Sequence, residues 1–153
     1  MIIRKATLKD FEALKTLWAE FFLLEASTDE RLDPAWVKHG LPVALSKSLR
    51  NKKEISFLAE EKGKILGYSS SEIIPSRRTL YKKQGHLYNL YVIPKYRKKG
   101  IGKKLLEKSL EWFNKNKIKD LKILAYSWNT KAQKLYRKYG FSDYMLTLKK
   151  IRK

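Results

Sequence analysis

Residues 90–103 of the chain read LYVIPKYRKKGIGK. In this stretch an apolar, strand-like run ends at Val92, a basic loop follows, and a helix is expected to begin at the two glycines. Gly100 and Gly102 have no side chain, so their backbone N–H groups can approach a ligand closely. N–H groups at a helix start are unpaired and carry partial positive charge, which predicts an anion-binding site. Four basic residues add full charges around it: Arg97, Lys98, Lys99 and Lys103.

The glycine spacing differs from two common nucleotide-binding patterns. The stretch lacks the G-x-x-x-x-G-K-S/T spacing of a P-loop and the G-x-G-x-x-G spacing of a dinucleotide-binding fold. Taken alone, R-x-x-G-x-G also fits a glycine turn that opens an ordinary surface helix. The order of strand, basic loop and helix around it favours the anion-binding interpretation.

Length and composition limit the class of protein. A chain of 153 residues, 43% of them hydrophobic, fits a single globular domain with its own core. It contains no cysteine, which excludes disulfides, thiolate metal sites and a cysteine nucleophile. Two histidines are too few for a histidine-rich metal centre, so no metal is expected. No apolar run approaches the roughly 18 residues of a membrane span, and the first residues do not resemble a secretory signal. We therefore expect a cytoplasmic protein without a membrane partner.

The net charge of +20 is unevenly distributed along the chain. Residues 1–80 carry 14 lysines and arginines against 11 acidic residues, whereas residues 81–153 carry 21 against 4. A field of this size concentrates anions near one half of the molecule. Three interpretations are open: a lysine-rich solvated surface, an anionic cofactor or substrate, and a nucleic acid.

Hydrophobic periodicity predicts a mixed α/β chain. Strands are expected over residues 2–6, 55–61, 64–74, 87–92, 121–126 and 141–149. Helices are expected from residue 7 to an acidic loop at 25–34, and over residues 35–50, 101–115 and 129–139. Pro42 predicts a break or kink in the second helix, and Lys62-Gly63 predicts a hairpin turn. Residues 75–85 are expected to form a polar, basic connection.

A second motif lies downstream, where residues 129–141 read NTKAQKLYRKYGF. This segment is similar to the N-x-x-A-x-x-x-Y-x-x-x-G-F signature of the GCN5-related N-acetyltransferases (GNAT) and agrees with it at every fixed position. Residues 97–102 resemble the Q/R-x-x-G-x-G/A pyrophosphate loop of the same family. The interval between the two motifs has the length of one helix and one strand, as in that family.

The resemblance implies a fold, an activity and a co-substrate. The implied fold is α/β, with a GNAT-like mixed sheet of six to seven strands, helices on both faces and strands splayed at the cofactor site. Residues 1–153 would form a single N-acetyltransferase domain. The implied activity is acetyl transfer from acetyl-CoA to a small-molecule or protein amine, by a monomer or homodimer and without a metal.

The resemblance also implies roles for individual residues. The backbone of Leu90, Tyr91 and Val92 would pair with the pantetheine arm of CoA. Asn129 would hydrogen-bond the pantetheine or the end near the phosphates, and Tyr136 would lie near the thioester sulfur. The CoA pyrophosphate would be held at the loop and helix start by Arg97, Lys98, Lys99, Gly100, Ile101, Gly102 and Lys103.

The residue types constrain the chemistry. Without cysteine, an acyl-thiol enzyme is impossible, which favours direct attack of the amine in a ternary complex. Tyr136 is a candidate general acid because a phenol is protonated at neutral pH, although a helix aromatic is more often a packing residue. A backbone N–H of Tyr91 or Val92 could stabilise the oxyanion.

The general base is where the sequence departs from the family. Many relatives resemble I-E-D-L-Y-V before the pyrophosphate loop, whereas residues 87–92 here read LYNLYV and lack both carboxylates. His86 and Glu72 are the candidates, since an imidazole exchanges protons near neutral pH. Removal of the proton through water, or arrival of an already neutral amine, remains open.

The acceptor and two alternative functions also remain open. Glu25, Asp29, Glu30 and Asp33 form an acidic loop that could attract a cationic amine such as a polyamine, an amino sugar, a protein N-terminus or a lysine. A solvated loop explains the same residues equally well. The missing carboxylates would also fit a CoA-binding but inactive relative. The basic C-terminal half would fit a nucleic-acid-binding module, which is less favoured because no nucleic-acid-binding motif is present.

Overall fold

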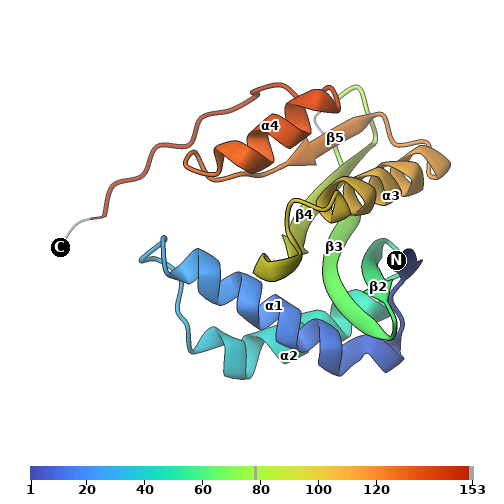
Figure 1. Ribbon diagram of the computed structural model, residues 1–153. Coiled ribbons are helices and arrows are strands. Elements are labelled where there is room, and N and C mark those ends of the chain that lie inside the picture. Colours follow the sequence, from blue (N-terminus) through green and yellow to red (C-terminus); the bar gives the residue numbers. More distant parts are fainter. Residues whose placement is uncertain (78, 152–153) are drawn as a thin grey trace. The chain divides into compact units, whose positions relative to one another are not determined.

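The structure, a computed structural model, describes residues 1–77 and 79–151. The chain forms two compact units, Met1–Ile123 and Leu124–Lys153. The first unit contains the sheet and three of the four described α-helices (Figure 1). Its elements are β1 (Ile2–Lys5), the 3-10 helix η1 (Leu8–Asp10), α1 (Phe11–Ala26), α2 (Trp36–Arg50), β2 (Glu54–Glu61), β3 (Lys64–Pro75), β4 (Lys83–Val92), the 3-10 helix η2 (Pro94–Tyr96), α3 (Ile101–Lys115) and β5 (Asp120–Ile123). The second unit contains α4 (Thr130–Lys138).

The sheet has five strands in the order β1-β2-β3-β4-β5. The first four strands run antiparallel to their neighbours, and β5 runs parallel to β4. The predicted hairpin turn at Lys62 and Gly63 is confirmed, because both residues have positive φ angles of 49° and 73° and Glu61 pairs with Lys64. Two consecutive positive φ angles are typical of the tight turns that join twisted antiparallel strands.

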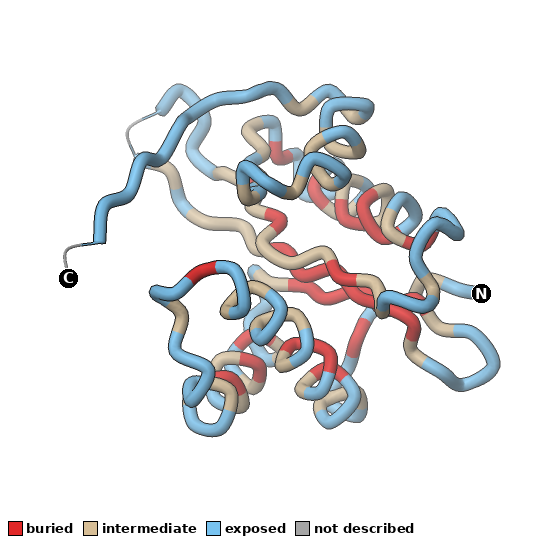
Figure 2. Tube along the Cα trace, turned by 60° about the vertical axis from the view of Figure 1, so that its left-hand side comes forward, coloured by how far each residue is buried: buried red, intermediate tan, exposed pale blue. Residues whose placement is uncertain are grey.

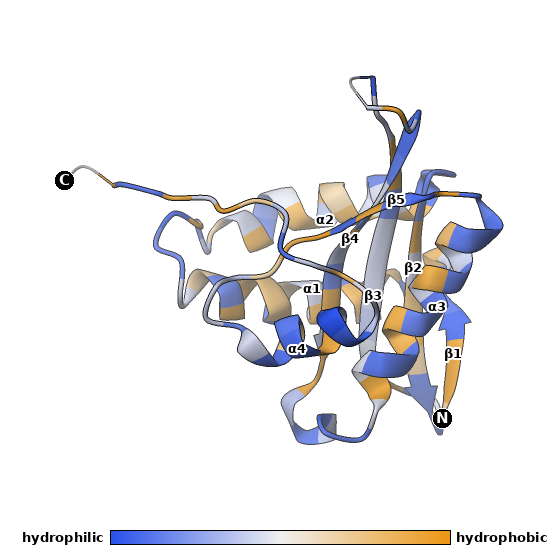
Figure 3. Ribbon diagram, turned by 90° about the horizontal axis from the view of Figure 1, so that it is seen from above, coloured by the Kyte–Doolittle hydropathy of each residue, from blue (hydrophilic) through white to orange (hydrophobic). Residues whose placement is uncertain are grey.

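Helices cover both faces of the sheet, as predicted (Figure 1). On one face, α1 and α2 pack their buried residues Leu14, Leu17, Leu41 and Leu45 against Tyr68 and its neighbours on the strands. On the other face, α3 places Ile101 and Leu105 against Phe57 and Leu66. Figure 2 shows burial concentrated in the strands and on the helix faces turned toward them, and Figure 3 shows α3 banded in apolar and polar residues, as expected of an amphipathic helix.

Two predictions about the strands near the C-terminus were wrong. The structure has five strands among its described residues where six to seven were predicted, because residues 141–149 have no regular secondary structure. A strand exists only through its partner, and residues 124–151, the described part of the second unit, contain no strand that could pair with this segment. The side chains of Tyr144, Leu146 and Leu148 are accordingly exposed. The strand predicted at 121–126 is also shorter, ending at Ile123.

Two further predictions about elements differ from the structure. Strand β4 begins at Lys83, inside the stretch predicted as a connection. Gly85, the last residue of the predicted connection, lies within β4, where a Cβ would lie 2.6 Å from the ring of Phe113 on α3. Helix α2 is continuous through Pro42, so no break occurs there.

Candidate functional site

The edge of β4 opens where β5 ends. Strand β5 pairs only with Gln84 to Leu87, and the last pair joins Leu87 to Ile123. On the other side, β3 pairs along the full length of β4, with a bulge that leaves Tyr88 unpaired between Leu87 and Asn89. Among the described strands, none therefore lies beside residues 88–92 on the β5 side. The backbone of Leu90, Tyr91 and Val92, predicted to contact pantetheine, forms this open edge.

The helix start beyond this edge is open as well. Gly100 precedes α3 with φ 75°, a left-handed conformation that glycine adopts without strain. Because Gly100 has no side chain, the cap residue of α3 accepts no hydrogen bond from the first N–H groups of the helix. A Cβ at Gly100 would meet no described atom within 4 Å, so the space beside Gly100 itself is free. The helix start predicted at the glycines is thus confirmed, and anion binding there stays a prediction.

Basic side chains surround the loop between β4 and α3. Arg97 donates from Nε to the carbonyl of Val92 at 2.9 Å, and its guanidinium lies 5.7 Å from the centre of the Tyr91 ring. The Nζ atoms of Lys64, Lys95 and Lys99 all lie within 6 Å of the centre of the Tyr96 ring, at 5.8, 5.2 and 5.8 Å. A hydrogen bond with Lys64 and the nearby ammonium charges lower the pKa of Tyr96. This concentration of cations favours an anionic ligand.

The two candidates for the general base lie together. Glu72 on β3 and His86 on β4 are register partners, and His86 Nδ1 lies 3.1 Å from Glu72 Oε1. Their side chains are 31% and 16% exposed. His86 Nε2 is buried and has no hydrogen-bond partner among the described residues. When Nδ1–H donates to the carboxylate, the lone pair on Nε2 is free to accept a proton.

Sequence reasoning missed the polar residues beside this pair. Glu54 on β2 is the register partner of Glu72, so both carboxylates lie on the same face of the sheet. Tyr88 donates its hydroxyl proton to Glu54 Oε2 at 3.1 Å, and its Oη lies 3.1 Å from Ser48 Oγ on α2. Burial raises the pKa of Tyr88, and the charge of Glu54 raises it further. The two-residue alternation of strand side chains could have placed Glu54 and Glu72 on one face, but not as neighbours.

The second unit holds the remaining predicted site residues. Asn129 caps α4, because its Oδ1 accepts a hydrogen bond from the N–H of Ala132 at 3.2 Å. Tyr136 packs edge-on against Phe141 with ring centres 6.3 Å apart. Burial raises the pKa of Tyr136 to about 12, so its phenol keeps its proton throughout the neutral range. Gly140 follows α4 with φ 85°, as predicted for a residue at the end of this helix.

The four acidic residues of the loop between α1 and α2 lie in different environments. Asp29 is buried and paired with Arg31, and Asp33 accepts a hydrogen bond from the N–H of Ala35 at 2.8 Å. Glu30 is exposed. Burial, and then the charge of Asp29, raises the pKa of Glu25 to about 7. Attraction of a cationic amine by this loop stays a prediction.

The described residues contain neither a metal-binding cluster nor a membrane-spanning helix. No group of histidine and acidic side chains there could hold a metal ion. No helix in the described part of the chain combines the length and apolar character that crossing a membrane requires.

Comparisons with known proteins agree with both motifs. A sequence model of the Acetyltransferase (GNAT) family matches residues 11–141. The chain is 27% identical over 146 residues to the uncharacterized N-acetyltransferase YhfO of Bacillus subtilis, covering 94% of this chain and 91% of that protein.

Two solved structures support the fold. A predicted acetyltransferase from Clostridium acetobutylicum, solved with acetyl-CoA, has a TM-score of 0.79 and 24% identity, over 97% of this chain and 95% of that chain. The aminoglycoside N-acetyltransferase AAC(6')-Iy, solved with a bisubstrate analogue, has a TM-score of 0.77 and 18% identity, over 99% of this chain and 97% of that chain. At these identities the two structures establish the fold alone.

Proposed function

The chain belongs to the GNAT acetyltransferase family, and on this premise we propose that it moves the acetyl group of acetyl-CoA to a primary amine by direct attack in a ternary complex. The observation that carries the proposal is the uncapped start of α3 behind Gly100, next to the open edge of β4. We propose further that residues 1–153 act as one catalytic domain.

The binding of CoA is supported by two features of the first unit. The N–H groups from Lys98 to Lys103 would hold the pyrophosphate, because helix-start amides favour bound anions. The open edge of residues 88–92 would add the extended pantetheine arm as a sheet adds a strand. In the second unit, Asn129 would contact the arm through groups that its capping bond leaves available.

The base in our proposal is His86, with Glu72 as the residue that orients it. The Nε2 of His86 would take a proton from the acceptor ammonium, and the neutral amine nitrogen would then attack the thioester carbonyl carbon. Glu72 would stabilise the resulting imidazolium through the 3.1 Å contact at Nδ1. This pair would replace the carboxylates that many relatives carry within residues 87–92.

The remaining steps use the backbone of β4 and one phenol. Negative charge that develops on the carbonyl oxygen would be stabilised by the N–H of Tyr91 or Val92. As the new C–N bond forms, the C–S bond breaks, and Tyr136 would give its proton to the departing sulfur. The amine nitrogen loses its second proton to solvent. The phenolate of Tyr136 then takes up a proton from solvent. A positioned acid of this kind contributes roughly 10²- to 10⁴-fold to the rate.

The proposal is tested by binding and turnover together. Titration calorimetry with CoA measures the site, and incubation with acetyl-CoA and a panel of primary amines follows thiol release and the mass gain of each amine. We expect binding, and release of one thiol for each acetyl group transferred. Lack of CoA binding would overturn the proposal. Binding without turnover over the whole panel would instead support an inactive relative.

A further inference from the structure

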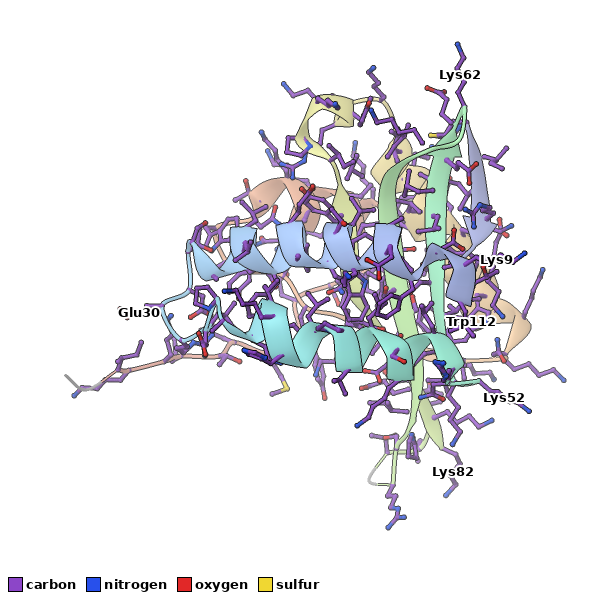
Figure 4. All side chains as sticks on the ribbon, turned by 90° about the horizontal axis from the view of Figure 1, so that it is seen from below. Lys9, Glu30, Lys52, Lys62, Lys82 and Trp112 are labelled. Atoms are coloured by element: carbon purple, nitrogen blue, oxygen red, sulfur yellow. The ribbon has the colours of Figure 1, made fainter. Side chains whose placement is uncertain are left out.

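A recess of about 310 Å³ lies between α1 and α2 on one side and β2, β3 and β4 on the other. In Figure 4, Lys52 marks the approach to β2 beside the end of α2, and Lys82 marks the far end of the β3–β4 ribbon. All the residues that line the recess belong to the first unit. Six of these residues are polar, charged or aromatic: Trp18, Lys47, Ser48, Glu54, Glu72 and Tyr88.

The recess concentrates negative charge in a strongly basic chain. Glu54 and Glu72 are direct register partners, an arrangement of like charges that destabilises a sheet. The chain has 35 lysines and arginines against 15 acidic residues, yet Lys47 is the sole cation among the described lining residues. No ion pair within the described part of the chain joins Lys47 to either carboxylate. A cationic ligand would relieve the repulsion between Glu54 and Glu72.

The two carboxylates are not equivalent. Glu72 is engaged by His86, at 3.1 Å. Glu54 receives hydrogen bonds from two neutral donors, the Tyr88 hydroxyl at 3.1 Å and the Asn51 amide at 2.8 Å. These bonds fix the orientation of Glu54 without neutralising its charge. Glu54 therefore has a negative charge available that the proposed base does not use.

The aromatic wall of the recess gives a second, independent indication of a ligand. Trp18 and Tyr88 both line the recess, and Trp18 is 7% exposed. Their rings meet edge to face at 87°, with centres 6.2 Å apart. Aromatic rings that line a recess beside carboxylates favour an ammonium group.

We propose that this recess binds the non-reacting ammonium group of a small diamine acceptor, with Glu54 as the residue that determines this specificity. The inference rests on the proposed acetyltransfer, and it names the acceptor class of that site. Tyr88 links the recess to the open edge of β4. Its hydroxyl contacts Glu54, and it is the first residue of β4 beyond the pairing with β5. One amine would reach the open edge of β4 near His86, while the other stays beside Glu54.

The test compares two acceptors of equal length on three proteins. The acceptors are 1,5-diaminopentane and 5-aminopentan-1-ol, which differ in one terminal charge. The proteins are the unmodified chain, Glu54→Gln, and Glu12→Gln as a control at an exposed acid on α1. Glutamine can accept the hydrogen bond from Asn51 at its carbonyl oxygen and donate from its amide to the Tyr88 hydroxyl, so the substitution removes the charge and reverses one hydrogen bond. Steady-state kcat and KM are measured with saturating acetyl-CoA.

We expect the unmodified chain and Glu12→Gln to prefer the diamine in kcat/KM by roughly tenfold or more, the usual size of a charge-assisted hydrogen bond. Glu54→Gln should lose this preference through a higher KM for the diamine, with kcat for both amines within about twofold of the unmodified chain. Glu54→Asp should retain part of the preference.

Other outcomes separate the two proposals. Turnover of both amines with no preference, or a preference that survives in Glu54→Gln, would overturn the diamine site and leave the acetyltransferase proposal intact. Absence of CoA binding would overturn both. Should Glu54→Gln fail to fold, thermal unfolding of the unmodified chain with each amine decides the question: stabilisation by the diamine alone supports the site, and equal effects contradict it.

Discussion

His86 and Glu72 face each other across β3 and β4, with Nδ1 of the imidazole 3.1 Å from Oε1 of the carboxylate. The contact directs the other ring nitrogen, Nε2, into a buried position where no described residue binds it. A carboxylate on one ring nitrogen and a free lone pair on the other is the arrangement of a histidine that accepts protons.

Replacing His86 should therefore slow the chemical step. We expect His86→Ala to lower kcat by roughly 10²- to 10⁴-fold while the Kd for CoA changes by less than about twofold. Imidazole added to the buffer should restore part of the rate, since it can supply the missing base. The control is His39→Gln, which changes the other histidine, exposed on α2. Unchanged kcat in His86→Ala would show that the proton leaves by another route.

Replacing Tyr136 should remove the proposed proton donor. Burial raises the pKa of its phenol to about 12, so the group is protonated at every pH at which the reaction would be assayed. Tyr136→Phe keeps the ring that packs on Phe141, and we expect kcat to fall roughly 10²- to 10⁴-fold with little change in stability. Tyr144→Phe, at a residue that is 88% exposed, is the matched control. Equal rates for both variants would assign Tyr136 to packing alone.

Glycine at position 100 should matter for CoA and not only for folding. Gly100 and Gly63 have nearly the same φ angles, 75° and 73°, and a Cβ at either would meet nothing within 4 Å. Each Gly→Ala substitution should cost about 1 kcal/mol of unfolding free energy, because alanine is strained at positive φ. Gly100→Ala alone should also weaken CoA binding, by displacing the N–H groups at the start of α3. Denaturation and calorimetry on both variants measure the two effects, and equal CoA affinity would contradict the pyrophosphate site.

Asp10 should make stability depend on pH in the acid range. Hydrogen bonds from Arg4 and Thr7 hold its pKa at about 2, below the ordinary value of 3.8. The stabilisation is present above about pH 4, where the unfolded carboxylate is ionised, and disappears as the pH falls toward 2. Asp10→Asn should thus cost roughly 2 kcal/mol at pH 7 and almost nothing at pH 2.

The control for this experiment is Asp143→Asn. Asp143 pairs with Arg137, but its side chain is 85% exposed, and such pairs contribute at most about 1 kcal/mol. Urea denaturation at both pH values compares the variants. A constant difference between Asp10→Asn and the unmodified chain across this range would contradict the assigned ion pair.

The parts of the fold that could be predicted from the sequence are those that local chemistry determines. The turn at Gly63, the helix start at Gly100 and the cap at Asn129 each depend on neighbouring residues only, and each is confirmed. The strand predicted at residues 141–149 depends on a partner strand, which a local pattern cannot supply. Residues 83–85 were predicted as part of a connection because the packing of Gly85 against Phe113, which is distant in sequence, leaves no local signal.

The candidate site likewise has parts that could be predicted from the sequence and parts that could not. The loop proposed to bind phosphate is a contiguous motif that could be read directly from the sequence, and its binding of phosphate stays a prediction. Glu72 and His86 were identified as separate alternatives, and their contact depends on the register of β3 and β4. The recess around Trp18 and Glu54 is assembled from residues of five elements and follows from the fold alone.

The early end of β5 has a practical consequence. Past Leu87, one side of β4 is a row of backbone groups with no neighbouring strand in the described part of the chain, and such a row accepts any extended peptide, including a second copy of the same protein. If the pantetheine arm covers this row, bound acetyl-CoA also protects the protein against aggregation. Protein stored with acetyl-CoA should then aggregate more slowly than protein from which acetyl-CoA has been removed by dialysis.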